Sequence, residues 1–224
     1  MTNYTDEKFY NDYFELLISR VTHSTMSLEK DLGNPDDSKN AIRMKDNIKA
    51  FEYLLENLNI PLSEQMIIKV ANLINASSIY ISEGYRNYGE YLAESNIPIS
   101  NPKSIRNDML KLINDYYHNW KDMDPFEREA RFHIDFIRIH PFEDGNGRTG
   151  RLLLNFNLLS QNIPPVIITE DLDNNYKKFI HDKNIKEMAN MFRIQSQKEK
   201  EVFDKLYEQY NFTSSEEINN TVKK

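Results

Sequence analysis

The sequence contains no cysteine and few residues that interrupt helices. Of its 224 residues, only six are glycine and eight are proline. The absence of cysteine excludes disulfide bridges, thiol catalysis and thiolate metal sites, and it fits the reducing cytoplasm, which is the location we expect. No apolar run approaches the roughly 20 residues of a membrane span. The acidic, aromatic N-terminus is unlike a secretory signal. We therefore expect no membrane partner.

Basic residues are also fewer than acidic ones. The chain has 28 Lys and Arg against 35 Asp and Glu, which gives a net charge of −7. Such a balance argues against nucleic acid as a partner of the protein as a whole, although a small basic pocket is compatible with it. Hydrophobic residues make up 39% of the chain and aromatic residues 12%, which is enough to form a core.

The spacing of apolar residues predicts an all-α protein. Residues 84–102 differ, because they are rich in Gly, Pro, Asn and Tyr without a helical period, and they predict a loop or a small β-hairpin. Residues 211–224 are expected to form a flexible tail. The expected helices cover residues 7–22, 38–58, 62–75, 103–120, 125–139, 147–161 and the remainder to about 210.

One short segment, residues 140–151, concentrates the chemistry. It reads HPFEDGNGRTGR and holds three of the six glycines, among them Gly145 and Gly147. A glycine-rich loop that runs into a helix presents free N–H groups and the positive end of the helix dipole, which together favour phosphate. Arg148 and Arg151 follow on one stripe of an apolar helix, where each needs an anion as partner. The segment therefore predicts a polyphosphate site.

Three further side chains of this segment suit the same ligand. Asp144 is a carboxylate suited to the Mg²⁺ that accompanies polyphosphates. His140, beside the phosphate, is a natural general base. Asn146 is placed to orient a phosphate oxygen. The alternative is a glycine-rich connection between two helices whose arginines pair with carboxylates.

The segment resembles the signature of the Fic family, H-P-F-x-[DE]-G-N-G-R-x-x-R, at every fixed position. The surrounding sequence is similar over roughly residues 24–192. This resemblance implies a Fic-type helical bundle with a small β-hairpin flap. The usual activity of the family is protein adenylyltransferase activity: AMP is transferred from ATP to a Ser, Thr or Tyr hydroxyl of a target protein.

The resemblance also implies a role for each signature residue. His140 would deprotonate the attacking hydroxyl, and Asp144 would bind Mg²⁺ between the α- and β-phosphates. The N–H groups of residues 145–147, together with the Asn146 side chain, would hold the phosphates. Arg148 would contact the β-phosphate and Arg151 the γ-phosphate. A flap at about residues 86–105 would pair with an extended segment of the target.

Other activities stay open at this point. Relatives catalyse the reverse reaction, removal of AMP, or transfer another phosphate-linked group. A regulatory module that binds ATP without turnover is a further alternative, although it would not need His140. The resemblance is compatible with self-modification and with a homodimer.

Many Fic proteins carry an inhibitory helix with the pattern [ST]-x-x-x-E-[GN], whose Glu pairs with the second signature arginine. Thr25 and Glu29 fit it within residues 24–30, but Lys30 replaces the final Gly or Asn. Residues Thr213 to Glu217 also fit the shortened pattern. We favour the N-terminal copy, because it precedes the helix expected at 38–58, as in similar relatives.

These assignments divide the chain as follows. Residues 1–210 form a single Fic domain, with N-terminal helices in 1–60 and the Fic core in 61–195. Within the core, His133 shares a helical face with apolar residues, which predicts a buried histidine with a structural role. Tyr176 follows a proline pair, at a place where relatives have an aromatic residue near the adenine.

Overall fold

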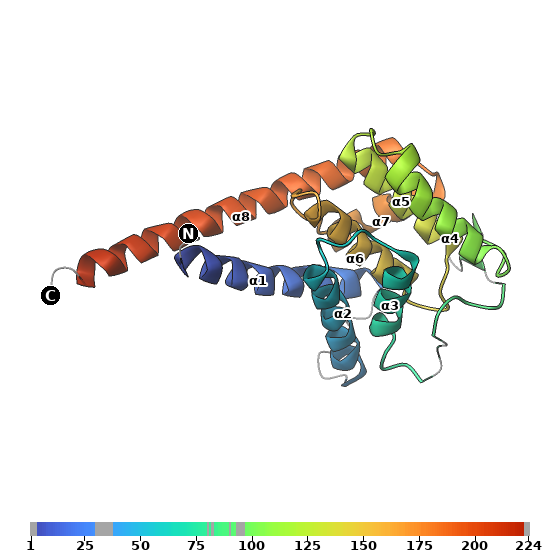
Figure 1. The fold of residues 1–224 in the computed structure, drawn as a ribbon, viewed down its shortest axis with the longest axis horizontal. Coiled ribbons are helices and arrows are strands. Elements are labelled where there is room, and N and C mark those ends of the chain that lie inside the picture. Colours follow the sequence, from blue (N-terminus) through green and yellow to red (C-terminus); the bar gives the residue numbers. More distant parts are fainter. Residues whose placement is uncertain are drawn as a thin grey trace.

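The computed structural model describes residues 4–29, 38–79, 81, 83–89, 91–92 and 97–221. The chain is predominantly helical, as the sequence predicts (Figure 1). Among the described residues, no helix is long and apolar enough to span a membrane. The elements are α1 Tyr4–Leu28, α2 Ser38–Glu56, α3 Glu64–Ile74, β1 Tyr91–Leu92, β2 Ile97–Pro98, α4 Ile105–Asn114, the π-helical turn η1 Asp115–Asn119, α5 Pro125–Ile139, α6 Asn146–Leu159, the 3-10 turn η2 Glu170–Leu172, α7 Asp173–His181 and α8 Ile185–Thr221.

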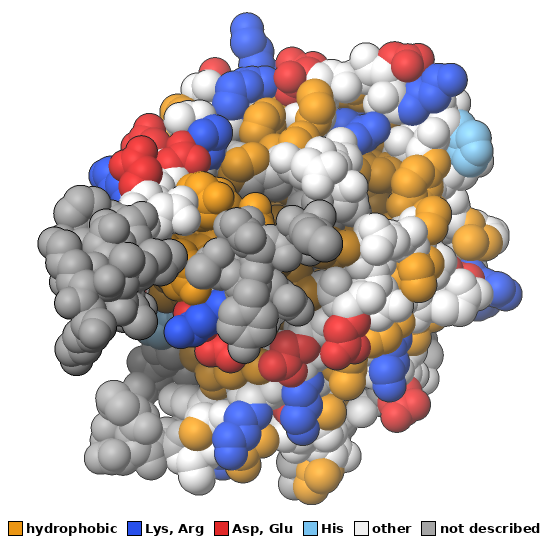
Figure 2. Space-filling view, turned by 60° about the vertical axis from the view of Figure 1, so that its left-hand side comes forward, with side chains coloured by type: hydrophobic (Ala, Val, Ile, Leu, Met, Phe, Trp, Pro, Cys, Tyr) orange, Lys and Arg blue, Asp and Glu red, His pale blue; other side chains and the backbone are white. Residues whose placement is uncertain are grey.

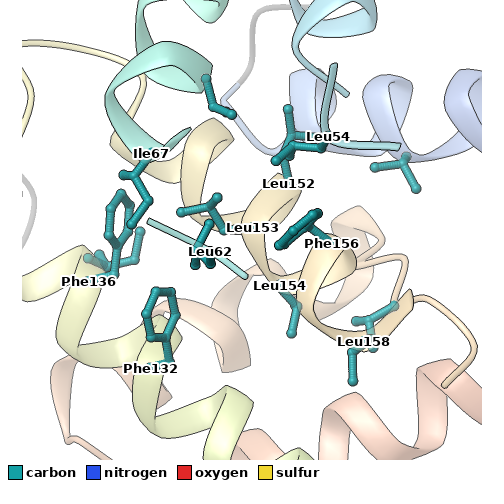
Figure 3. Close-up of a cluster of buried hydrophobic side chains, with 14 of the residues drawn as sticks. Leu54, Leu62, Ile67, Phe132, Phe136, Leu152, Leu153, Leu154, Phe156 and Leu158 are labelled. Atoms are coloured by element: carbon teal, nitrogen blue, oxygen red, sulfur yellow. The ribbon is translucent and has the colours of Figure 1, made fainter. Parts of the chain in front are cut away.

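Helix α6 lies at the centre of the molecule. It is buried on nearly all sides and packs against α1, α2, α3 and α5. Figure 3 shows its leucines between Phe132 and Phe136 of α5 on one side and Leu54 of α2 on the other. Its leucines and Phe156 are buried against these neighbours, and its buried polar side chains require partners within the protein or from a ligand. The segment 140–151 leads directly into this helix, so the predicted site is built on the most enclosed element of the fold.

The two terminal helices, α1 and α8, lie side by side through aromatic contacts. The ring of Phe9 on α1 lies 5.4 Å from that of Phe203 and 5.0 Å from that of Tyr207 on α8. Figure 1 shows α8 running on past the N-terminus of α1. These contacts hold the N-terminal part of α1 against α8.

Two helix ends differ from the sequence predictions. The last helix was expected to end near Tyr210, which is wrong, because α8 continues to Thr221. No glycine or proline follows Asp182, so nothing in the sequence interrupts a helix that has already formed. Helix α1 extends beyond the expected residue 22 to Leu28, because Met26 and Leu28 are buried in the core.

The polar connection after α3 contains the two short strands. β1 and β2 pair antiparallel, with Tyr91 opposite Pro98 and Leu92 opposite Ile97. The pair is followed directly by α4, which continues into η1, where the N–H of Trp120 donates to the carbonyl of Asp115 at 2.8 Å. The single helix expected over 103–120 is therefore α4 and a wider π-helical turn.

Charged residues of both signs are spread over the outside of the molecule. On the face shown in Figure 2, Lys and Arg side chains lie among Asp and Glu side chains and hydrophobic ones. Many of these charges form ion pairs, as Arg193 does with Asp124 at 2.8 Å. Exposed pairs of this kind contribute at most about 1 kcal/mol each to stability.

Candidate active site

The site begins where α5 ends, at His140. The N-terminus of α5 is fixed by Pro125 and by the carboxylate of Asp124, which accepts hydrogen bonds from the N–H groups of residues 126 and 127. At its other end His140 adopts a left-handed conformation, with φ 51° and ψ 61°. Such a conformation is usual for glycine and uncommon for other residues. The backbone at His140 must therefore be held by its surroundings.

Arg86 supplies that support. Its buried guanidinium donates from Nε to the carbonyl of His140 at 2.6 Å, from Nη1 to that of Tyr88 at 2.6 Å and from Nη2 to that of Ser100 at 2.5 Å. The backbone N–H of Arg86 also donates to the carbonyl of Pro141 at 2.9 Å. One side chain thus joins the end of α5 to both flanks of the β1–β2 segment.

Asn146 closes the loop that follows. Its Oδ1 accepts from the N–H of Phe142 at 3.0 Å, and its Nδ2 donates to the carbonyl of Phe142 at 2.8 Å. The Phe142 ring is buried against Phe136 and Tyr85. The sequence predicted that the Asn146 side chain contacts phosphate. In the structure both of its polar atoms also hold the loop, and the second hydrogen of Nδ2 and the backbone N–H remain as donors for an anion.

Asp144 lies at the edge of the loop, with its side chain 43% exposed. Its Oδ1 accepts from the N–H of Gly145 at 2.6 Å, and Nδ2 of Asn75 donates to its carbonyl at 3.0 Å. Gly145 has φ 78°, and a Cβ there would lie 3.0 Å from the Ile74 side chain. Glycine is therefore required both by the backbone conformation and by the close approach of α3.

Arg148 is buried beneath the loop. Its Nη2 pairs with Oδ2 of Asp144 at 2.9 Å and lies 3.4 Å from Oδ1 of Asn75. The first N–H groups of a helix have no acceptor within the helix, and here those of α6 begin beside this guanidinium. A cation and a helix N-terminus meet at one point, which is an arrangement that binds phosphate oxygens.

Arg151, one turn further along α6, is occupied by the end of α1. Its Nη2 donates to the carbonyl of Thr25 at 3.0 Å and pairs with Oε1 of Glu29 at 2.5 Å. Burial raises the pKa of Glu29, but Arg151, assisted by Arg148, outweighs burial, so the net pKa lies below its ordinary value. The ionised pair is therefore the form present at neutral pH. Thr25 participates through its backbone.

A magnesium ion fits this site only together with a polyphosphate. Among the described residues no group of three or more His, Asp or Glu side chains is arranged around a metal position. Asp144 offers one accessible carboxylate, and Arg43 lies 3.6 Å from its Oδ2. Mg²⁺ is commonly bound through one or two carboxylates, with substrate phosphates and water as the other ligands. The single carboxylate agrees with that mode.

The sequence predicted the loop but not the residues that support it. Asn75 carries no sequence signal, and Arg86 was placed only at the start of the flap, because these residues lie 69 and 54 residues from the atoms that they hold. His133, predicted to be a buried structural histidine, is 1% exposed with both ring nitrogens hydrogen-bonded. Tyr176, predicted to lie near adenine, is buried with its hydroxyl directed at His133.

Comparison with known proteins agrees with this geometry. Residues 61–158 match the Fic/DOC family. The chain is 38% identical over 86 residues to protein adenylyltransferase fic-1 of Caenorhabditis briggsae, which covers 38% of this chain and 17% of that protein. It is 43% identical over 60 residues to protein adenylyltransferase Fic of Nematostella vectensis, which covers 27% of this chain and 14% of that one. The chain thus spans a small part of these relatives.

Solved structures resemble the whole fold. A Fic domain-containing signaling protein from Bacteroides thetaiotaomicron has a TM-score of 0.69 at 19% identity, over 92% of this chain and 88% of that one. Fic-1 (residues 134–508) from Caenorhabditis elegans has a TM-score of 0.68 at 19% identity, over 95% of this chain and 68% of that one. These similarities extend the shared fold to the terminal helices.

Proposed function

We propose that this chain, whose residues 61–158 match the Fic/DOC family, is a protein adenylyltransferase. The substrates would be ATP and a Ser, Thr or Tyr hydroxyl of a protein. One observation carries the proposal: His140, the N-terminus of α6 and the buried Arg148 and Arg151 meet around a single loop. That arrangement combines a base with a polyphosphate site, which nucleotidyl transfer requires.

In the proposed reaction, the target hydroxyl attacks the α-phosphorus of ATP. The new oxygen–phosphorus bond forms as the bond from the α-phosphorus to the bridging oxygen breaks, and pyrophosphate leaves. His140 takes the hydroxyl proton, which then passes to solvent. A positioned base contributes about 10²–10⁴-fold to such a step. The rest of the rate acceleration would come from positioning of the reactants and from stabilisation of the phosphate charge by fixed hydrogen-bond donors.

The other loop residues would bind and orient the phosphates. The N–H groups of residues 146 and 147 and the Arg148 guanidinium would hold the α- and β-phosphates, whereas the N–H of Gly145 donates to Asp144. Arg151 would hold the γ-phosphate once Glu29 has left it. Bound Mg²⁺ would neutralise charge on the phosphate oxygens, and Asp144 would be its protein ligand.

The target protein would dock beside the strand pair. A short antiparallel pair with an open edge offers backbone groups to an extended peptide, and Arg86 connects this pair to His140. A solved structure of similar fold contains IbpAFic2 covalently tethered to Cdc42, with a TM-score of 0.61 at 17% identity. We extend protein docking from that relative to this chain, with β1–β2 as the flap.

Glu29 would inhibit the enzyme from within the same chain. Its carboxylate occupies the guanidinium that the γ-phosphate would need. Lys30, which departs from the inhibitory pattern, lies outside the described residues, as do the side chains of Thr213 and Glu217. Ser24 Oγ donates to the carbonyl of Ile168 at 2.5 Å, so the end of α1 is anchored close to the pair.

Further aspects of the proposal come from the sequence. We propose one domain over residues 1–210, with the Fic core in 61–195, and a cytoplasmic location. Self-modification and a homodimer belong to the same proposal. Each is compatible with a short chain that carries its own inhibitory residue.

The test compares wild type with Glu29→Gly and His140→Ala. Each protein is incubated with Mg²⁺ and ATP labelled at the α-phosphate, alone and with cell lysate, and intact mass and protein-bound label are recorded. We expect AMP on protein with the first two proteins, more of it with Glu29→Gly, and none with His140→Ala.

Other outcomes of this test would refute the proposal. A gain in intact mass equal to one phosphate, without protein-bound label from the α-phosphate, would indicate a phosphotransferase. Bound ATP without transfer in any sample would indicate a binding module. Loss of AMP from a previously modified protein, without its addition, would indicate the reverse reaction.

A further inference from the structure

Two buried residues outside the signature, His133 on α5 and Tyr176 on α7, form a hydrogen-bonded pair next to Arg151. Nε2 of His133 lies 2.7 Å from the hydroxyl of Tyr176, and Nδ1 lies 3.2 Å from the carbonyl of Gly150. The two side chains are 1% and 3% exposed. The Arg151 guanidinium interacts with the same Tyr176 hydroxyl.

The direction of each hydrogen bond follows from the groups present. The carbonyl of Gly150 can only accept, so Nδ1 of His133 carries the proton. Burial, assisted by the positive charge of Arg151, lowers the pKa of His133 to about 3, so the ring is neutral and Nε2 is an acceptor. Tyr176 therefore donates to Nε2, and the lone pairs of its oxygen remain for the guanidinium.

Arg151 needs this support because α1 holds only part of it. Its contacts with Thr25 and Glu29 are both made through Nη2. Among the described residues, the buried Nε atom has no hydrogen-bond acceptor. When Glu29 leaves, the guanidinium loses its carboxylate but keeps its neighbour Tyr176.

We propose that Tyr176 and His133 are positioning residues that orient Arg151 toward the terminal phosphate of ATP. This rests on the proposed function, in which Arg151 binds that phosphate. Neither residue would touch the reacting atoms. Their effect would be confined to the nucleotide that carries a γ-phosphate.

Tyr176→Phe is the sharpest variant, because it removes one hydroxyl and keeps the buried ring. The matched control is Tyr116→Phe. Tyr116 is also a buried tyrosine, but its hydroxyl donates to Glu129 instead. Both variants are made in Glu29→Gly, so that Arg151 is free to bind phosphate. Thermal unfolding of each protein verifies that it is folded.

The measurement is the Kd of ATP and of ADP, each with Mg²⁺, by calorimetry. We expect Tyr176→Phe to weaken ATP binding about fivefold, as suits the loss of one hydrogen bond near a charged group, and ADP binding less than twofold. The control should leave the ratio of the two Kd values unchanged. His133→Asn keeps a donor for Gly150 but removes the Nε2 acceptor, and it should reproduce the effect of Tyr176→Phe.

These Kd values distinguish the positioning role of Tyr176 from the proposed adenylyltransferase function. If Glu29→Gly prefers ATP over ADP and Tyr176→Phe retains that preference, the positioning role is refuted and the proposed function stands. If Glu29→Gly binds neither nucleotide, the proposed function fails, and the positioning role fails with it.

Discussion

The carboxylate of Glu29 occupies the space in which a side chain at Gly147 would begin. A Cβ placed on Gly147 would collide with Oε1 of Glu29 and lie 3.0 Å from Nη1 of Arg151. The end of α1 therefore rests directly on the first turn of α6. Glycine at this position makes room for the contact between Glu29 and Arg151, in addition to any room it makes for a phosphate.

This contact predicts energetic coupling between Gly147 and Glu29. Gly147→Ala in the wild type should reduce the free energy of unfolding by about 1 kcal/mol, because the methyl group displaces the carboxylate. In Glu29→Gly the same change should be neutral or stabilising, since alanine favours a helix by about 1 kcal/mol over glycine. Urea unfolding of the four proteins measures the coupling. Equal effects in both backgrounds would show that the two residues do not interact.

The ion pair between Glu29 and Arg151 predicts inhibition that is insensitive to pH near neutrality. The pKa of Glu29 is lowered from 4.5, so its contribution to stability is present above that pH and is lost only as the pH falls through the folded-state value. The ratio of Glu29→Gly to wild-type activity should therefore be constant between about pH 6 and 8. Initial rates at several pH values test this. A ratio that falls steadily from pH 8 to 6 would contradict it.

We expect the substitution of Arg86 to lower turnover without weakening ATP binding. Lysine cannot reproduce the fork that reaches the carbonyls of His140, Tyr88 and Ser100. In Glu29→Gly, Arg86→Lys should lower kcat about tenfold, equivalent to about 1.4 kcal/mol, and change the KM for ATP little. Arg106→Lys is the control, because that side chain is 72% exposed and pairs with Glu64. An increase in KM at unchanged kcat would assign Arg86 to nucleotide binding instead.

We expect the titration of the buried Glu129 to make the stability of the protein depend on pH, independently of the active site. Burial raises its pKa to about 7, although Tyr116 and Asn157 donate hydrogen bonds to it. Its contribution is complete below pH 4.5, the ordinary value, and is lost as the pH rises through about 7. The unfolding free energy should then fall by about 1.4 kcal/mol per pH unit between pH 5 and 7 from this group. Glu129→Gln should flatten that slope in urea titrations, and an unchanged slope would exclude Glu129 as its source.

The helices were predictable where the sequence has clear periodicity and clear ends. Helix α5 begins at Pro125 and ends at Ile139, as expected, because Asp124 caps one end and Pro141 prevents continuation at the other. The end of α8 was missed because polar residues without a helix breaker leave the boundary undetermined by local sequence. The π-helical turn at η1 was missed because the spacing of its side chains differs little from that of an α-helix.

The loop of residues 140–151 was predictable because its residues are adjacent in sequence. The residues that support it from other elements could not be predicted in this way. The type of residue at position 146 was not enough to predict what its side chain contacts. A side chain beside a phosphate site can bind the ligand or hold the loop, and only the coordinates show that its amide closes on Phe142. The pairing of Glu29 with Arg151 was anticipated from a known pattern, although 122 residues separate the two.

In the proposed mechanism Glu29 competes with ATP for Arg151, and because the two residues belong to one chain, the local concentration of this competitor is set by geometry alone. Dilution of the protein cannot relieve it, and ATP must outcompete a tethered group at high effective concentration. The long α1, held against α8 by Phe9, keeps that tether short and stiff. Under the proposed function, any partner that bends or lifts α1 would thereby set the ATP concentration at which AMP transfer begins.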